Sequence, residues 1–210
     1  MTFHKEYLTL YAVTDRTWLG QRTMAEAVRE AVLGGATMIQ LREKQMDTES
    51  FLKEAIEVKA VTDAFGIPLI INDNIEVCQK SGAAGVHVGQ SDTEAAKARA
   101  ILGRDKIIGV TAKTPELAKL AEDAGADYIG CGAVFGSTTK TDTSKISKEQ
   151  LKSVCEAVRL PVVAIGGINE NNAALLAGTK IAGIAVVSSV FAKKDIQAAA
   201  RTMKKLADKL

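Results

Sequence analysis

A short apolar run in the first quarter of the chain ends in the polar segment Gln40-Leu41-Arg42-Glu43-Lys44. Alternate residues of an extended strand share a face, so Gln40, Arg42 and Lys44 would point the same way. An amide and two cations on one face suit a polyanion, with the guanidinium as a fork and the ammonium as a point charge. A solvated strand end whose charges bind nothing would have the same sequence.

Two aspartates follow later apolar runs. Asp73 lies within Asn72-Asp73-Asn74, and Asp92 comes directly after Gln90-Ser91. Carboxylates that also meet substrate phosphates are typical Mg²⁺ ligands, so Asp73 and Asp92 are predicted to bind Mg²⁺. The alternatives are an Asx turn at Asp73 and a helix N-cap at Asp92.

Gly166-Gly167 and Ser188-Ser189 follow the last two apolar runs. Glycine lets backbone N–H groups approach an anion, and a helix N-terminus favours negative charge. We therefore expect a phosphate site here, with Asn169 as the N-cap of a following helix. A plain turn from strand to helix is the alternative.

The segment Gly132–Thr143 is rich in hydroxyl groups and contains Lys140. Hydroxyls and a lysine suit phosphate oxygens, and long loops near an active site are usually functional. The expected contacts are Ser137, Thr138, Thr139 and Lys140. A surface loop without a ligand is the competing interpretation.

These groups need a fold that brings strand ends together. Short β-branched runs alternate with helical patterns along the chain, which indicates parallel strands joined by crossovers. The expected strands are Leu8–Val13, Met38–Leu41, Leu69–Ile71, Gly85–Val88, Ile107–Val110, Tyr128–Cys131, Val162–Ile165 and Gly183–Val187. Helices are expected at Met24–Leu33, Glu49–Phe65, Asp92–Leu102, Pro115–Ala124 and Lys148–Val158.

Eight such units predict an α/β fold, a single (β/α)8 TIM barrel over residues 1–210, in which functional residues gather at the carboxyl ends of the strands. Glycines at 35, 82, 125 and 178 precede even-numbered strands, as expected for left-handed helix ends. A doubly wound open sheet would carry the same local signals.

The composition narrows the class of protein. Hydrophobic residues make up 47% of the 210 residues and aromatics only 4%, which suits a parallel sheet buried on both faces. A net charge of +2 gives no reason to expect nucleic acid or a membrane surface as partner. Three scattered cysteines and the lack of a signal peptide or of about 18 consecutive apolar residues predict a cytoplasmic protein.

Seven segments, in this order, resemble the thiamine phosphate synthase family. They are Gln40–Lys44, Ile71–Asn74, Gly85–Asp92, Gly109–Thr111, Thr138–Thr143, Ile165–Ile168 and Val187-Ser188. The resemblance runs across nearly the whole chain. One departure is Thr111, at a position where serine is common in the family.

The resemblance implies a transferase of thiamine biosynthesis that joins 4-amino-2-methyl-5-hydroxymethylpyrimidine diphosphate to a thiazole phosphate, carboxylated or not, and releases pyrophosphate with Mg²⁺ as cofactor. The implied pyrimidine diphosphate site is Gln40, Leu41, Arg42, Glu43, Lys44, Asn72, Thr111 and Lys140, and among these Arg42, Lys44, Lys140 and Thr111 are the implied catalytic residues. The implied thiazole phosphate site is Ser137, Thr138, Thr139, Gly166, Gly167, Val187 and Ser188. Small-molecule substrates are the only partners that follow; whether the protein is a homo-oligomer stays open.

Three other functions are possible on a phosphate-binding barrel. A thiazole tautomerase on the same scaffold would need a proton-transfer residue, usually histidine, after the fifth strand, where the chain has Thr111–Thr114. A Schiff-base aldolase would need a lysine inside a strand, and the expected strands contain none. A non-catalytic barrel that binds phosphorylated ligands predicts binding without turnover. His87 is expected to be a packed or hydrogen-bonded interior residue rather than a ligand.

Overall fold

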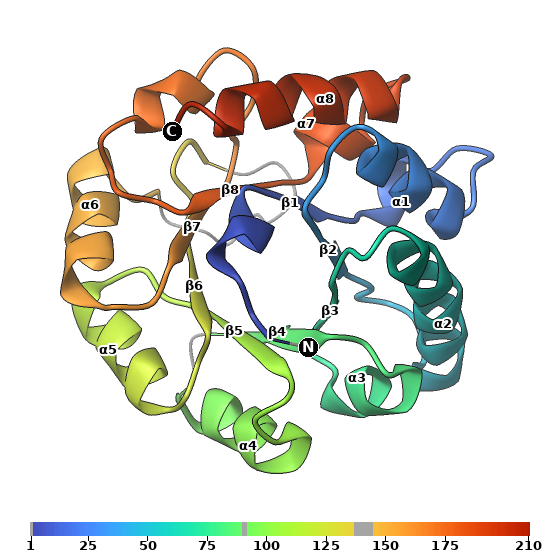
Figure 1. The fold of residues 1–210 in the computed structure, drawn as a ribbon, viewed down its shortest axis with the longest axis horizontal. Helices are drawn as coiled ribbons and strands as arrows, with labels where there is room; N and C mark the ends of the chain where they lie inside the picture. Colours follow the sequence, from blue (N-terminus) through green and yellow to red (C-terminus); the bar gives the residue numbers. More distant parts are fainter. Residues whose placement is uncertain (1, 90–91, 137–144) are drawn as a thin grey trace.

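The computed structural model describes residues 2–89, 92–136 and 145–210, and of residues 92 and 93 the backbone alone. Eight parallel strands close into a barrel in which each strand pairs with the next and β8 pairs with β1 (Figure 1). The strands are β1 (Leu10–Val13), β2 (Met38–Leu41), β3 (Leu69–Asn72), β4 (Gly85–Val88), β5 (Ile107–Thr111), β6 (Tyr128–Gly132), β7 (Val162–Ile165) and β8 (Gly183–Val186). The predicted α/β barrel is confirmed.

Helices surround the barrel as an outer ring (Figure 1). They are α1 (Met24–Leu33), α2 (Thr48–Ala64), α3 (Ile75–Ser81), α4 (Asp92–Leu102), α5 (Pro115–Asp123), α6 (Lys148–Ala157), α7 (Ser188–Phe191) and α8 (Ile196–Ala207). At the start of six of them, an N-cap side chain accepts a backbone N–H of the first turn, as expected. These accepting residues are Thr23, Asp47, Asn74, Thr114, Ser147 and Asp195. None of the helices in the described ranges is long and apolar enough to cross a membrane.

Two expectations about the elements are wrong. The first strand begins at Leu10 rather than Leu8, because Lys5–Leu8 forms a 3₁₀ helix, η1. Asn169 is not a helix N-cap: its side chain accepts the Asn171 N–H at 2.9 Å, and only the 3₁₀ helix η3 (Ala173–Leu176) lies between β7 and β8. A local Asx turn has taken the place of the expected helix start.

The predicted left-handed glycines are confirmed. Gly35, Gly82, Gly125 and Gly178 have φ values of 105°, 72°, 85° and 79°. Each lets the chain leave a helix or a 3₁₀ turn and enter the next strand in a conformation that other residues adopt at a cost.

The core has two parts. One lies between the barrel and the helices, and the other fills the barrel with side chains such as Tyr11, Met38 and Tyr128. The N-terminal segment packs onto this second part, where the ring of Phe3 stacks on Tyr128 at 5.8 Å. The dark blue η1 lies over the centre of the barrel (Figure 1). This segment therefore covers the amino-terminal end of the strands.

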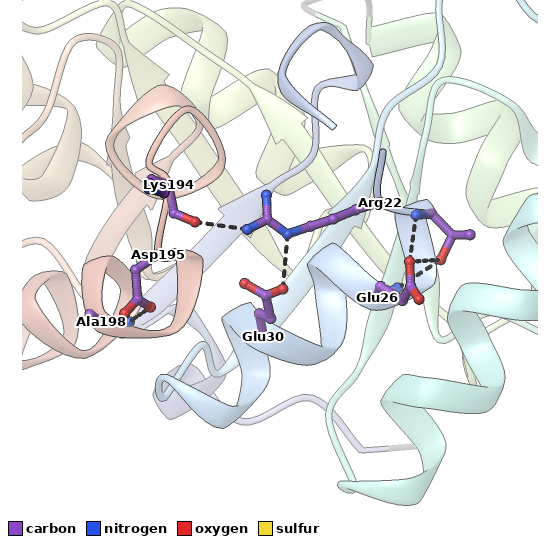
Figure 2. A network of polar contacts seen from close by, with 7 residues as sticks. Arg22, Glu26, Glu30, Lys194, Asp195 and Ala198 are labelled. Carbon is purple, nitrogen blue, oxygen red and sulfur yellow. Dashed lines mark hydrogen bonds and ion pairs between the residues drawn. The ribbon is translucent and has the colours of Figure 1, made fainter. Parts of the chain in front are cut away.

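Arg22 connects two segments that lie far apart in the sequence. Its Nε donates to Glu30 Oε1 at 3.0 Å, and its Nη2 donates to the Lys194 carbonyl oxygen at 2.7 Å (Figure 2). The loop before α1 is thereby bonded to the connection between α7 and α8. The short helix α7, which follows β8, is thus held from its carboxyl-terminal side.

Candidate active site at the barrel mouth

A cavity of about 1030 Å³ opens at the carboxyl ends of the strands. One wall is formed by the ends of β2 and β3, and the opposite wall by the loops that follow β7 and β8. The two walls carry different chemistry, one cationic and acidic and the other rich in glycine and serine. This mouth is where enzymes of this fold place their catalytic residues.

The β2 side of the cavity agrees with the expected strand alternation. Gln40, Arg42 and Lys44 all line the cavity. The Arg42 N–H donates to the buried Thr14 hydroxyl at 3.0 Å, which fixes the backbone at the end of β2. The buried Arg42 Nε has no hydrogen-bond partner in the described part of the chain. This leaves a buried guanidinium donor free to bind an anion.

Asp73 stands at the end of β3, next to Lys44. Its Oδ2 accepts from Lys44 Nζ at 2.6 Å and from Asn72 Nδ2 at 2.7 Å. Its backbone is left-handed, with φ 62°, and its N–H donates to the His87 carbonyl at 2.9 Å. The strand end thus holds this carboxylate at the cavity, and the structure does not favour the Asx-turn alternative.

Leu41 and Glu43 point away from this wall. Leu41 is fully buried in the core between the barrel and the helices. The Glu43 carboxylate pairs with Arg16 at 3.2 Å, and Arg16 also pairs with Glu54. The same alternation that directs their neighbours into the cavity directs these two outward. Their side chains therefore do not form part of the predicted pyrimidine diphosphate site.

Glycine is required in the wall after β7. Gly166 and Gly167 have φ values of 104° and 67°. A Cβ on Gly166 would lie 2.5 Å from the Ala133 Cα, and one on Gly167 would lie 2.7 Å from the Gly136 carbonyl oxygen. Both residues line the cavity. The loop after β6 approaches so closely that no other residue fits without movement.

The loop after β8 completes this wall. Val187 and Ser188 line the cavity, and Ser188 is the first residue of α7. The N–H groups of Val190 and Phe191 donate to the Val187 carbonyl oxygen, whereas those of Ser188 and Ser189 have no backbone acceptor among the described residues. The buried Ser189 hydroxyl likewise has no partner among the described residues. Unpaired donors beside two glycines make this wall suitable for a phosphate group.

Some predicted residues lie outside the described part of the chain. They are Ser137, Thr138, Thr139 and Lys140, together with the side chain of Asp92, whose backbone begins α4. The described residues contain no group of three or more histidine, cysteine or acidic side chains able to hold a metal ion. Of the predicted magnesium ligands, Asp73 alone can be placed by its side chain.

Several residues at the cavity were not among the predicted ligands, and three of them are Lys193, Glu170 and Tyr11. Lys193 and Glu170 form an ion pair of 3.1 Å between the loops after β8 and β7. Tyr11 faces the cavity from inside β1. The two charged residues could have been found by following each loop further from its strand. Tyr11 could have been found by treating the first strand like the other seven.

Thr111 and His87 lie on adjoining strands, β5 and β4. Thr111 lines the cavity, and its Oγ1 lies 3.0 Å from His87 Nε2. The Nδ1 of His87 lies 3.0 Å from the Tyr128 hydroxyl. The expectation that His87 is a hydrogen-bonded interior residue is confirmed.

Comparisons with known proteins agree with one another. A family model described as thiamine monophosphate synthase matches residues 10–190. The chain is 50% identical over 195 residues to the thiamine-phosphate synthase of Ruminiclostridium cellulolyticum, which covers 93% of each chain. It is 47% identical over 191 residues to that of Clostridium tetani, which covers 91% of each chain. A thiamine phosphate pyrophosphorylase from Pyrococcus furiosus shares the fold with a TM-score of 0.89 at 36% identity over 97% of each chain.

Proposed function

The chain belongs to the thiamine monophosphate synthase family, and we propose that its cavity joins 4-amino-2-methyl-5-hydroxymethylpyrimidine diphosphate to a thiazole phosphate. The activity is that of its relatives, a transferase of thiamine biosynthesis. The observation that carries the proposal is the pairing of a cationic wall with a glycine-rich wall across one cavity. Such a cavity suits two substrates that each carry phosphate.

The cationic wall suits the diphosphate. Arg42 offers an unpaired buried donor, and Lys44 adds a point charge beside it. The buried amide of Asn72 supplies a neutral donor, and Gln40 lines the same wall. Lys140, in the predicted loop after β6, would add a further cation. Preorganised positive charge stabilises the negative charge that develops on a departing pyrophosphate.

The donor set at this wall fits a magnesium ion. The Asp73 side chain is 51% exposed and stands beside the proposed diphosphate site, so its carboxylate is accessible to a cation. Magnesium is commonly held by one or two carboxylates plus substrate phosphates. Asp73, with Asp92 as the second predicted ligand, would hold it. The bound ion would supply additional positive charge to the leaving group.

The glycine-rich wall suits the thiazole phosphate. Gly166, Gly167, Val187 and Ser188 would hold its phosphate, with Ser137, Thr138 and Thr139 as the predicted contacts from the loop after β6. This arrangement leaves the thiazole ring between its phosphate and the pyrimidine.

The proposed reaction depends on how the two substrates are oriented, and it needs no proton transfer. The carbon–oxygen bond of the pyrimidine diphosphate breaks, and its electron pair leaves on pyrophosphate. The lone pair of the thiazole nitrogen forms the new carbon–nitrogen bond. No proton moves in these two steps, which agrees with a cavity whose one described histidine is bonded to Tyr128 and Thr111.

The direct test is to mix purified protein with both substrates and Mg²⁺ and to measure pyrophosphate and thiamine phosphate, with an EDTA control. We expect both products in equal amounts and their loss with EDTA. Product that persists in EDTA would contradict the magnesium proposal alone. Binding of both ligands without product would contradict the proposed reaction, and would favour a ligand sensor or the tautomerase.

A further inference from the structure

A chain of hydrogen bonds crosses the interior of the barrel beneath the cavity. Gln40 Nε2 donates to the Tyr11 hydroxyl at 2.6 Å, and the Tyr11 and Tyr128 hydroxyls lie 2.8 Å apart. The chain continues from Tyr128 to His87 Nδ1 at 3.0 Å and from His87 Nε2 to Thr111 Oγ1 at 3.0 Å. Its two ends, Gln40 and Thr111, both line the cavity.

The direction of every bond follows from the first. The Tyr11 oxygen accepts from Gln40, and among the described residues its other hydroxyl partner is Tyr128. The single buried phenol proton is therefore paired when Tyr11 donates to Tyr128. Tyr128 in turn donates to His87 Nδ1. A neutral imidazole that accepts at Nδ1 carries its proton on Nε2 and donates it to Thr111. Burial raises the pKa values of both tyrosines well above the usual range, so both keep their protons at neutral pH.

This direction determines what the two ends offer a ligand. One N–H of the Gln40 amide is engaged inside the barrel, which fixes the orientation of the amide and leaves its oxygen as an acceptor. The Thr111 hydroxyl already accepts from His87, so its own proton remains for donation. The cavity thus presents an acceptor at the end of β2 and a donor at the end of β5. An aminopyrimidine carries the complementary set, an amino donor and ring-nitrogen acceptors.

We propose that Tyr11, Tyr128 and His87 are positioning residues that couple Gln40 to Thr111, so that the site selects an amino group over a carbonyl on the pyrimidine ring. This inference rests on the proposed function and extends it to substrate selection. A 4-oxo ring would place a carbonyl oxygen against the Gln40 oxygen. Turning the Gln40 amide would reverse the direction of every hydrogen bond from Tyr11 to Thr111. The Thr111 hydroxyl would then donate to His87 and no longer to the ligand. Rejection is strong where a wrong ligand leaves buried polar groups unpaired.

The first test needs no activity. The sequence has two histidines, His4 and His87, so ¹⁵N-histidine labelling gives two imidazole spectra, and His4→Gln identifies the signals of His87. From the two hydrogen bonds of the ring, we expect Nε2 of His87 to carry a proton and Nδ1 to accept one. A proton on Nδ1, or on both nitrogens, would overturn the proposed direction. This result stands whether or not the protein makes thiamine phosphate.

The second test compares the amino substrate with its 4-oxo diphosphate analogue. Tyr128→Phe removes one hydroxyl from the chain with little change in volume, and Tyr7→Phe removes a tyrosine hydroxyl outside it. We expect Tyr128→Phe to lower the ratio of kcat/KM between the two diphosphates at least about tenfold, since the Gln40 amide can then turn independently. The KM for thiazole phosphate should be unchanged, and Tyr7→Phe should keep the wild-type ratio.

An unchanged ratio in folded Tyr128→Phe would overturn the coupling. Tyr11→Phe breaks the same chain at another link and serves if Tyr128→Phe does not fold. A wild-type protein that forms no product with the amino substrate would instead contradict the proposed function. The histidine spectra would then still decide whether the chain has the inferred direction.

Discussion

Lys44 Nζ lies 2.6 Å from Asp73 Oδ2, and this ion pair joins the ends of β2 and β3 at the edge of the cavity. Both side chains are about half exposed, at 48% and 51%. An ion pair this exposed contributes little to stability. Its place at the diphosphate wall therefore favours a role in binding, in which substrate and magnesium would separate the two charges.

Replacing Asp73 should separate catalysis from folding. We expect Asp73→Asn to slow magnesium-dependent pyrophosphate release on the order of a hundredfold, by analogy with the loss of one preorganised electrostatic contact. Initial rates over a range of Mg²⁺ concentrations, with thermal melts, would measure this. Asp63→Asn is the matched control, because Asp63 pairs with Lys59 on the outer helix α2. Near-normal turnover by folded Asp73→Asn would contradict the magnesium assignment.

Gly167 should be essential for the phosphate wall. Gly167→Ala adds a Cβ that would lie 2.7 Å from the Gly136 carbonyl oxygen at a φ of 67°. The loop must shift, and we expect the KM for thiazole phosphate to rise about tenfold or more.

Gly178→Ala is the control for backbone strain alone, since Gly178 has φ 79° and nothing within 4 Å of an added Cβ. It should lose about 1–2 kcal/mol of stability and keep the wild-type KM. Equal KM values in both variants would exclude Gly167 from the site.

Much of the barrel could be predicted from periodicity, because strands, helices and left-handed glycines are set by local chemistry. Met38–Leu41 and Met24–Leu33 have the expected bounds. The sequence predicts a helix cap at Asn169, where the structure has an Asx turn, because both use the same side-chain acceptor. At the site, alternation correctly directs Gln40, Arg42 and Lys44 into the cavity.

The interior hydrogen-bond chain was beyond prediction from sequence. Tyr11 and Tyr128 are 117 positions apart and meet because β1 and β6 close into one barrel. Nothing local in the sequence indicates that their hydroxyls touch. The family resemblance implies Leu41 and Glu43 as part of the pyrimidine diphosphate site. The outward direction of their side chains follows from the same strand alternation that directs Gln40 into the cavity.

Arg99 should support the fold without affecting catalysis. Its guanidinium donates to the carbonyl oxygens of Gly103, Lys106 and Gly125 and pairs with Asp127 at 2.7 Å. Arg99→Lys keeps the charge but loses the planar fork, so we expect a loss of about 2 kcal/mol in the free energy of unfolding. Urea unfolding would measure it. The kcat/KM of the folded fraction should equal the wild-type value; a large decrease would point to an unforeseen link with the cavity.

The pH dependence of stability should have opposite signs at two glutamates. Desolvation is the largest cause that raises the pKa of Glu43, and the neighbouring Glu54 adds to it. A raised folded-state pKa means that the native state holds the proton more tightly. Ionisation of Glu43 therefore lowers stability as pH rises from its unfolded pKa, near 4.5, through its folded pKa.

Glu26 behaves in the reverse way. The Thr23 backbone N–H donates to the Glu26 carboxylate in a capping box, which lowers the pKa of Glu26. The Glu26 carboxylate stabilises the folded state above the unfolded-state pKa. This stabilisation is lost as pH falls through the folded-state pKa. As pH rises from 4 to 7, we expect the stability of Glu43→Gln to increase relative to that of wild type. Over the same interval, the stability of Glu26→Gln should decrease relative to that of wild type. Urea unfolding at both pH values measures the two differences. Shifts of the same sign would show that Glu43 is stabilised as a carboxylate by Arg16 despite its burial.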